Sequence, residues 1–346
     1  MSSRPVVLWR SENESIFSQT VAAAASKLNI SELAVAKDYW VCEALRAVIS
    51  HAGNDLVFKG GTSLEKMRLV QRFSEDLDLL VTGRYGNKRA TERALKRMCA
   101  AAAGAIPGAV AFKPDNGSGG EKGAESADDS FWRKAYIEVP LAPELDTMGI
   151  ADPTRIMLEL GQAGGPTPTQ LMPVTSLLGR ELAAAGVPIA EYPDLASFEV
   201  EMLHPGRTLI EKLLRMNNFV ARTRGGRGEA DGWSRIGRQL YDVWALLGDR
   251  TVLELLSDKA TARAIVRDCI VVSQAYPLPD EEPPVGGFAA SEIFSREWRH
   301  SGVLRVEHEK AMRGLYYGVN APSFDVVLDR VEQHRSLLDM NSSDRN

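Results

Sequence analysis

The sequence predicts an α+β fold in which an α/β half is followed by an all-helical half. Short apolar runs bounded by glycine and polar turns alternate with helical stretches as far as residue 165, and helical periodicity dominates beyond it. The chain has 346 residues, whereas a typical domain has about 100–200. We therefore expect N-terminal helices over 1–50 that pack on an α/β core over 51–170, and a helical domain over 171–346.

Composition and charge limit the class of protein. Hydrophobic residues make up 44% of the chain and charged residues 25%, which is enough to form a core and excludes a wholly disordered chain. The net charge of −5 excludes a strongly basic coat protein, although it is compatible with a local basic patch. The sequence has no apolar stretch of about 18 residues and no apolar signal-peptide core, so we expect a soluble cytoplasmic protein without membrane contact.

Cysteine and histidine give no sign of a disulfide framework or a zinc site. The cysteines, Cys42, Cys99 and Cys269, are far apart and odd in number, as expected for free thiols in a reducing compartment. The histidines form no HxxxH pair. A histidine-based metal site is therefore not expected.

Each element of the first half has a local signal. Ser31 is a suitable N-cap for a helix that continues to about residue 50, and the apolar run 56–58 predicts a strand that ends at a glycine pair. The remaining elements are a helix over 63–70, a strand over 77–81, a helix over 88–106, and strands over 109–112, 135–139 and 156–160. The polar stretch 116–130 predicts a solvated loop.

The second half is expected to be helical beyond a boundary at 165–175, where Gly165 and Pro166 interrupt the chain. Helices are predicted over 176–186, 207–221, 238–248, 252–275, 292–318 and 323–340. Repeated proline makes 277–284 an extended connector within this half.

Two aspartates are the first candidates for chemistry. Asp76 and Asp78 alternate with Leu77 and Leu79 in a predicted strand, so both carboxylates point to one face and both leucines to the other. Two like charges about 7 Å apart repel each other. A divalent cation removes that repulsion, since Mg²⁺ binds one or two carboxylates together with substrate phosphates. A solvated strand edge is the alternative interpretation.

A glycine turn lies upstream of the aspartates. Gly60 and Gly61 end a strand, and Thr62 and Ser63 open a helix, so backbone N–H groups at this turn can bind the phosphates of a nucleotide. The pattern GxxxxGK[ST] is absent, so the turn is not a P-loop. An ordinary strand-to-helix turn is the alternative, but strand, glycine turn, helix and DxD strand within 24 residues are a more specific combination.

Several segments resemble the AbiEii/MenT family of nucleotidyltransferase toxins from type IV toxin–antitoxin systems, within the DNA polymerase beta-like nucleotidyltransferase superfamily. They are KGGTSLEKM (59–67), RFSEDLDLLV (72–81), AVAKDYWVCEALRAV (34–48), RTLIEKLLRM (207–216), GRQLYDV (237–243) and AMRGLYYG with FDVVLDRV (311–331). Two departures are Gln239, where a histidine is more usual, and the 14 residues between Gly61 and Asp76, slightly more than in many relatives outside the family. Neither departure removes a metal ligand.

The resemblance implies a nucleotidyltransferase core with a mixed sheet, in which Asp76 and Asp78 hold Mg²⁺ (or Mn²⁺). A third carboxylate completes the metal site in the superfamily; Glu159 is favoured over Glu138 for that place, and an ordinary surface residue is the alternative for either. The resemblance further implies these nucleotide-binding residues: Gly60, Gly61, Thr62, Ser63, Lys66 and Lys212.

The resemblance also gives Lys212 and Asp242 a role in catalysis. It implies that Lys212 reaches the nucleotide and that Asp242 assists from a facing helix. The simpler interpretation is a solvated lysine at the edge of an apolar helix stripe, with Asp242 paired to Arg238 one turn away.

The segment 221–238 is rich in arginine. Glycines and Trp233 accompany its arginines, which are Arg222, Arg224, Arg227, Arg235 and Arg238. Arginine and an aromatic ring on a flexible loop suit phosphate binding and base stacking. A solvated, disordered connection between helices is the alternative.

These features predict an NTP-dependent, pyrophosphate-releasing nucleotidyltransferase with nucleotide and Mg²⁺ in a cleft between its two domains. The resemblance implies an RNA acceptor, the tRNA 3′ end, whose modification would block translation, and a separately encoded antitoxin. One alternative is the same fold acting on a small molecule or a protein side chain. Another is a catalytically silent nucleotide- or RNA-binding module, against which the intact Asp76 and Asp78 argue.

Overall fold

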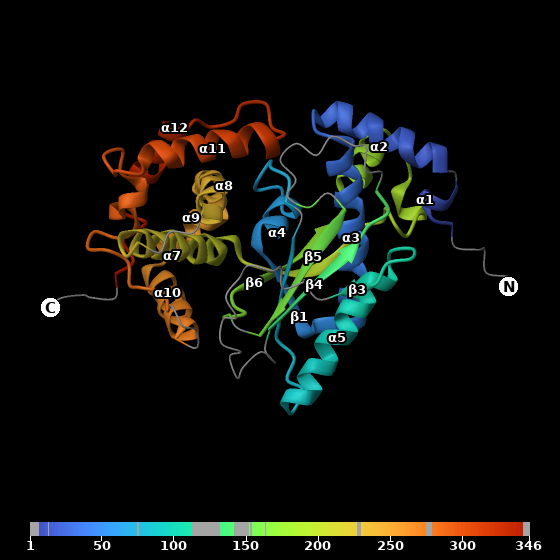
Figure 1. Ribbon diagram of the computed structural model, residues 1–346, viewed down its shortest axis with the longest axis horizontal. Coiled ribbons are helices and arrows are strands. Elements are labelled where there is room, and N and C mark those ends of the chain that lie inside the picture. Colours follow the sequence, from blue (N-terminus) through green and yellow to red (C-terminus); the bar gives the residue numbers. More distant parts are fainter. Residues whose placement is uncertain are drawn as a thin grey trace. The chain divides into compact units, whose positions relative to one another are not determined.

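The computed structural model describes residues 7–12, 14–74, 76–112, 132–141, 152, 154–162, 164–226, 230–274 and 279–341 (Figure 1). The chain divides into two compact units. Unit 1 comprises Met1–Met67, Phe73–Gln162 and Gln170–Met202, and unit 2 comprises Arg68–Arg72, Ala163–Thr169 and Leu203–Asn346. The chain therefore passes through unit 2 at Arg68–Arg72, a segment we call the connector, before it returns to unit 1.

A mixed sheet forms the centre of unit 1. Among the described residues it has seven strands in the order β3-β4-β5-β2-β1-β7-β6. Strand β1 pairs antiparallel with β2 and parallel with β7, whereas β2 pairs parallel with β5. The strands are β1 (Leu56–Lys59), β2 (Leu77–Val81), β3 (Ala111–Phe112), β4 (Trp132–Glu138), β5 (Arg155–Gly161), β6 (Thr169–Val174) and β7 (Phe198–Leu203). This sheet confirms the α+β class.

Two of these strands correct the expected layout. Strands β6 and β7 lie at or beyond the expected boundary at 165–175, so the sheet continues into the part expected to be helical. Strand β6 is at the edge of the sheet and only its last residue, Val174, is fully buried, so its sequence lacks a strand's apolar alternation. In β7 the alternation of Phe198, Val200 and Met202 is a usable signal.

Helices cover the sheet of unit 1. They are α1 (Trp9–Glu12), α2 (Glu14–Leu28), α3 (Glu32–Ala52), α4 (Gly60–Lys66), α5 (Lys88–Gly104) and α6 (Leu177–Ala184). Ser31 caps α3 by accepting a hydrogen bond from the backbone N–H of Ala34, as predicted. Helix α3 is buried along most of its length because it packs against α2, α5 and α6. Helix α4 begins at Gly60 and ends at Lys66, earlier at both ends than the expected 63–70.

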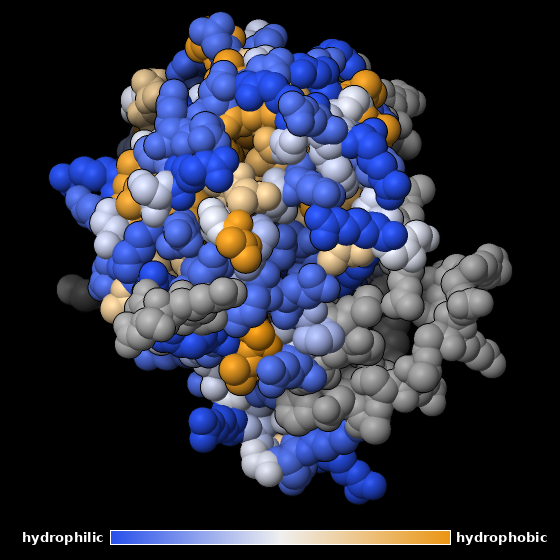
Figure 2. All heavy atoms as spheres, turned by 90° about the vertical axis from the view of Figure 1, so that its left-hand side faces the viewer, coloured by the Kyte–Doolittle hydropathy of each residue, from blue (hydrophilic) through white to orange (hydrophobic). Residues whose placement is uncertain are grey.

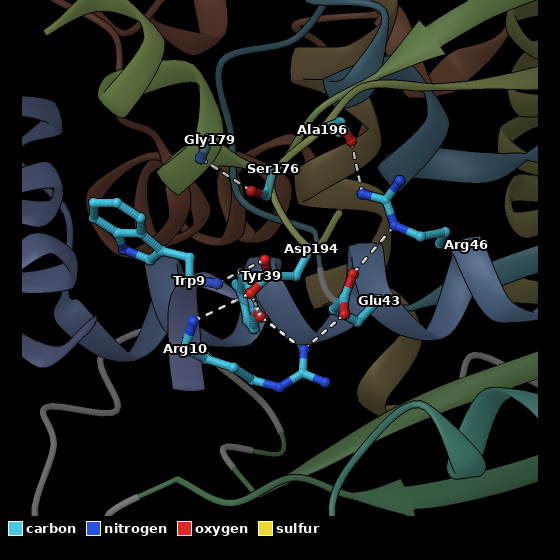
Figure 3. A network of polar contacts seen from close by, with 9 residues as sticks. All are labelled: Trp9, Arg10, Tyr39, Glu43, Arg46, Ser176, Gly179, Asp194 and Ala196. Atoms are coloured by element: carbon cyan, nitrogen blue, oxygen red, sulfur yellow. Dashed lines mark hydrogen bonds and ion pairs between the residues drawn. The ribbon is translucent and has the colours of Figure 1, made fainter. Parts of the chain in front are cut away.

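A polar network holds the N-terminal helix α1 against α3 (Figure 3). The Asp194 carboxylate accepts hydrogen bonds from the backbone N–H of Trp9 (2.9 Å) and Arg10 (3.2 Å) and from the hydroxyl of Tyr39 (2.6 Å). The Arg10 guanidinium donates to the Tyr39 hydroxyl (2.8 Å) and pairs with Glu43 (2.7 Å). One buried carboxylate therefore satisfies the first backbone donors of α1 and the hydroxyl of α3 at once.

Replacing Asp194 with alanine is expected to lower the free energy of unfolding by about 1–3 kcal/mol, because it leaves a buried hydroxyl and two backbone donors without an acceptor. Urea denaturation measures this change. The matched control is Glu92→Ala, which removes the exposed partner of Lys96 in an i,i+4 pair and should cost less than about 0.5 kcal/mol. Equal losses in the two variants would contradict the anchoring role of Asp194.

Unit 2 is built from helices. They are α7 (Pro205–Arg224), α8 (Ala230–Leu246), α9 (Arg250–Ser257), α10 (Lys259–Ser273), α11 (Ser301–Leu315) and α12 (Phe324–Gln333). Helix α8 lies between α11 and α7 and contacts both (Figure 1). A Cβ on Gly237 of α8 would lie 2.7 Å from the carbonyl carbon of Glu307, so the glycine allows α11 to approach closely. The helix expected over 252–275 is two helices, because Asp258 leaves helical geometry and caps α10.

The surface of the side that carries these helices is mostly hydrophilic. Figure 2 shows its hydrophobic residues in small separate areas among hydrophilic ones. Within the described ranges, no helix combines the length and the apolarity needed to cross a membrane.

All three cysteines are free and buried, in line with the expected absence of a disulfide framework. Burial raises the pKa of the Cys42 and Cys269 thiols to about 12, so both stay protonated and unreactive near neutral pH.

Candidate functional site

The glycine turn of unit 1 is packed directly against one of the two aspartates. Gly60 has φ +81°, and a Cβ at this position would lie 2.2 Å from Asp78 Oδ2. The contact follows from the sheet, because Lys59 at the end of β1 pairs with Asp78 on β2. Only glycine fits both the positive φ and the close approach. The glycine turn and the strand that carries Asp78 are therefore packed directly against each other.

Asp78 lies on β2, and Asp76 immediately precedes this strand. Leu77 and Leu79 are buried in the core, whereas Asp76 and Asp78 are half-buried. The Thr62 hydroxyl, itself buried, donates a hydrogen bond to the backbone carbonyl of Asp76 (2.5 Å). Helix α4 thus fixes the start of the strand that carries Asp78.

The expected third carboxylate, Glu159, already has a cationic partner. Glu159 on β5 is in register with Asp78 on the neighbouring parallel strand, so both side chains leave the same face of the sheet. The Glu159 carboxylate also pairs with Lys134 on β4 (3.4 Å). Glu138 lies opposite Arg155, at the far end of β4, and is exposed. No three His, Cys, Asp or Glu side chains among the described residues are grouped as a metal site.

The aspartate pair nevertheless fits a magnesium ion. Mg²⁺ prefers hard oxygen ligands and takes one or two carboxylates together with water and substrate phosphates. Asp78 offers a carboxylate beside a glycine turn whose backbone can approach a phosphate, and Asp76 lies two residues before it in the sequence. A third protein carboxylate is not needed for such a site.

Two other residues of the expected nucleotide site are buried and bonded. The Ser63 hydroxyl donates to the carbonyl of Gly60 (2.9 Å) within its own helix. The Lys66 ammonium is paired with Asp38 and with Glu65 (2.9 Å). Burial alone would lower the pKa of Lys66, but the carboxylates raise it above its usual value. These two carboxylates compensate the buried charge of Lys66, so a bound phosphate is not needed to explain its position.

The same network continues to helix α6. Arg180 pairs with Glu65, and Asp38 accepts a hydrogen bond from the backbone N–H of Leu177 (2.6 Å). Burial opposes the charge on Glu65, but Lys66 and Arg180 lower its pKa to about 2. This cluster joins α3, α4 and α6 underneath the glycine turn.

A second buried cluster lies within unit 2. The Lys212 ammonium on α7 lies 2.9 Å from Asp242 Oδ2 on α8. Arg72, in the connector, binds both oxygens of Asp242, with distances of 2.6 and 2.7 Å. The exposed fractions are 0% for Asp242, 4% for Arg72 and 8% for Lys212. Asp242 thus pairs with two cations from distant parts of the sequence.

Burial and charge act in opposite directions in this cluster. Burial alone would raise the pKa of Asp242, but Arg72 and Lys212 lower it to about 2. For Lys212 burial is the largest effect and lowers the pKa, Asp242 opposes this, and Arg72 adds to the lowering. Asp242 therefore remains a carboxylate, whereas Lys212 gives up its proton more readily than an ordinary lysine.

Arg72 is the residue that sequence reasoning missed. It lies in the same segment, RFSEDLDLLV, as the two aspartates, but its partner is 170 residues away in the sequence. Its position four residues before Asp76 is the only sequence signal for it.

The arginine-rich segment is mainly helical, which corrects the expected flexible loop. Helix α7 ends at Arg224 and helix α8 begins at Ala230. The last turn of α7 therefore carries Arg222 and Arg224, and α8 carries Arg235 and Arg238. Arg227 lies outside the described residues. Arg224 pairs with Glu292 (3.0 Å) at the rim of a hollow of about 470 Å³.

Trp233 is also held in a packed environment. Its ring meets Phe219 edge-on, with centroids 4.7 Å apart, and lies 5.8 Å from Trp298 and 5.2 Å from His300. Trp298 also lines the hollow. The aromatic ring therefore joins α7, α8 and the segment before α11.

Gly60→Ala is expected to destabilise the protein more than the matched change Gly86→Ala. Gly86 has a similar φ of +76° but nothing within 4 Å of a Cβ, so its replacement costs only backbone strain, about 1–2 kcal/mol. The clash with Asp78 should add about 1–3 kcal/mol at Gly60. Urea denaturation gives both values. In an Asp78→Ala background the difference should shrink, because only the contact with the Cβ of residue 78 (3.0 Å) remains, and an undiminished difference would contradict the contact with the carboxylate.

Comparison with known proteins adds independent information about the chain. A family model described as nucleotidyl transferase AbiEii toxin, type IV TA system, matches residues 43–330. A search of curated proteins found no match. The matched range is most of the chain and contains the glycine turn, both aspartates, the connector, Lys212 and Asp242. The chain belongs to the AbiEii family of nucleotidyl transferase toxins of type IV toxin–antitoxin systems.

Proposed function

We propose that the protein transfers a nucleoside monophosphate from an NTP to an RNA, the 3′ end of tRNA, in a Mg²⁺-dependent reaction that blocks translation. The family supports nucleotidyl transfer and an antitoxin partner. The observation that carries the proposal within the chain is the packing of Gly60 against Asp78, which brings the glycine turn beside one carboxylate of the DxD motif.

Asp76 and Asp78 are the proposed ligands of Mg²⁺ or Mn²⁺. When bound, the metal neutralises the triphosphate and lowers the pKa of an attacking hydroxyl. Leu77 and Leu79 anchor the strand in the core, and the alternation of the segment is proposed to turn both carboxylates to the other face. The Gly60–Gly61 turn presents backbone N–H groups where the glycines allow a phosphate to approach. Glu159 is the candidate third ligand, and it would have to leave Lys134 to serve as one.

Lys212 and Asp242 are the proposed catalytic residues of unit 2. The Lys212 ammonium is proposed to bind an oxygen of the triphosphate and to stabilise the charge that develops as pyrophosphate leaves. Asp242 holds that ammonium in place from the facing helix (2.9 Å). Ser63 and Lys66, whose polar atoms are engaged inside unit 1, are proposed to support the turn rather than to touch the nucleotide.

Asp76→Asn and Asp78→Asn are each expected to reduce nucleotide transfer by at least about 100-fold, because the neutral amide binds Mg²⁺ poorly and leaves the triphosphate charge uncompensated. The measurement is incorporation of label from each of the four α-labelled NTPs into total RNA with Mg²⁺. Glu138→Gln, at an exposed position on β4, is the matched control and should retain activity. Transfer to a small acceptor but never to RNA would refute the RNA assignment.

RNA binding is proposed to involve the arginines at the end of α7 and in the chain that follows. Replacing Arg222, Arg224 and Arg227 with alanine should weaken RNA binding and flatten its salt dependence, by about 0.7–0.9 in log–log slope for each phosphate that is no longer neutralised. Filter binding across a salt series measures this. Arg250→Ala on α9, whose side chain is 87% exposed, is the control for loss of a surface charge. An unchanged slope in the triple variant would refute the role of these arginines.

A further inference from the structure

The buried cluster of unit 2 divides one carboxylate unequally between two cations. Arg72 Nε binds Asp242 Oδ1 and Arg72 Nη2 binds Oδ2, at 2.6 and 2.7 Å. Lys212 contacts only Oδ2, which it shares with Arg72. An ammonium has three N–H donors. Among the described residues Asp242 is the one ion-pair partner of Lys212, so donors remain for a further oxygen atom.

The connector that carries Arg72 is fixed in unit 2 by its backbone. The backbone N–H of Gln71 donates to the Tyr241 hydroxyl (2.8 Å), and the carbonyl of Gln71 accepts from the backbone N–H of Tyr317 (2.9 Å). Arg72 itself forms an antiparallel bridge with Tyr316. Because Tyr241 and Asp242 are consecutive residues of α8, the same helix turn holds the connector by both backbone and side chain. The guanidinium is therefore a rigid partner for Asp242.

We propose that Arg72 is a positioning residue: by binding both oxygens of Asp242 it prevents the carboxylate from binding Lys212 through both oxygens, and so keeps part of the ammonium available to a phosphate group. This inference rests on the proposed role of Lys212 in binding the triphosphate. Arg72 itself need not touch the nucleotide. Planar, bidentate pairing with a carboxylate is the geometry for which arginine is suited and lysine is not.

The charged groups around Lys212 determine how the proposal can be tested. Asp242 on α8 raises its pKa, while Arg72 from the connector and Arg215 on α7 lower it, in addition to the lowering by burial. Arg207, which is also on α7, is engaged elsewhere, since it pairs with Asp268 and with Glu211 (3.3 Å). Removing Arg72 and removing the charge of Asp242 should therefore move the pKa of Lys212 in opposite directions.

The test compares Arg72→Gln, Arg72→Lys and Asp242→Asn in the full chain. Lysine labelled with ¹³C at Cε is titrated by NMR, and Lys212→Arg identifies the Lys212 signal. Arg72→Gln should move the Lys212 titration to higher pH and Asp242→Asn to lower pH, each by about one pH unit or more, as expected for a charge within about 4–6 Å. Arg207→Gln, which removes another buried arginine of unit 2, is the matched control and should leave the titration in place.

Kinetics provide the second readout. Arg72→Gln should raise the KM for NTP by about tenfold or more with a smaller effect on kcat, because Asp242 then competes with the phosphate for Lys212. Arg72→Lys, which keeps the charge but not the bidentate geometry, should restore KM only in part. A purely structural role for Arg72 would lower the active fraction without moving KM or the titration.

The outcomes separate the inference from the function on which it rests. If the wild-type protein transfers nucleotides and Arg72→Gln leaves the titration and KM unchanged, the positioning role is overturned and the function stands. If both variants move the titration in the same direction, the positioning role is likewise overturned. If the titrations move in opposite directions but the wild-type protein transfers no nucleotide, the electrostatic coupling is supported and the proposed function fails.

Discussion

The contact between Gly60 and Asp78 is the constraint on which the site of unit 1 depends. Antiparallel pairing of β1 with β2 brings the end of one strand beside the carboxylate of the other, and a side chain at Gly60 would have no room there. The Thr62 hydroxyl then holds the backbone of Asp76. Backbone pairing, rather than a set of converging side chains, thus brings the turn beside Asp78. Such an arrangement is rigid before any ligand binds, which suits electrostatic stabilisation of a transferring phosphoryl group.

The two buried ionic clusters differ in their balance of cations and carboxylates. In unit 1 two cations, Lys66 and Arg180, meet two carboxylates, Asp38 and Glu65, so the cluster is matched in charge and joins three helices. In unit 2 two cations meet one carboxylate, and Lys212 has a share of only one oxygen. Buried charges demand compensation in a low-dielectric interior. The first cluster is therefore complete in itself, whereas the second is suited to receive an anion.

The sequence predicted most elements, including the glycine turn and the strand that carries Asp78, and each miss has a physical cause. Alternation predicted Asp76 and Asp78 on one strand face because a strand has a period of two that is visible locally. Arg72 was missed because its role depends on a partner 170 residues away, which no local pattern reveals. Strand β6 was missed because an edge strand needs few buried residues, and Ser63 and Lys66 have typical phosphate-binding side chains that tertiary packing has engaged elsewhere.

The ribosome makes the connector long before it makes the residues that bind it. Arg68–Arg72 is made early, but the helix that holds it, α8, leaves the ribosome much later, after a further 170 residues have been added to reach Asp242. At about 5–20 residues per second, this interval is on the order of 10–30 s. A chain that is interrupted before α8 therefore has the glycine turn and both aspartates but no partner for Arg72. In a protein proposed to stop translation, the Lys212 cluster is thus finished only when most of the chain has already been made.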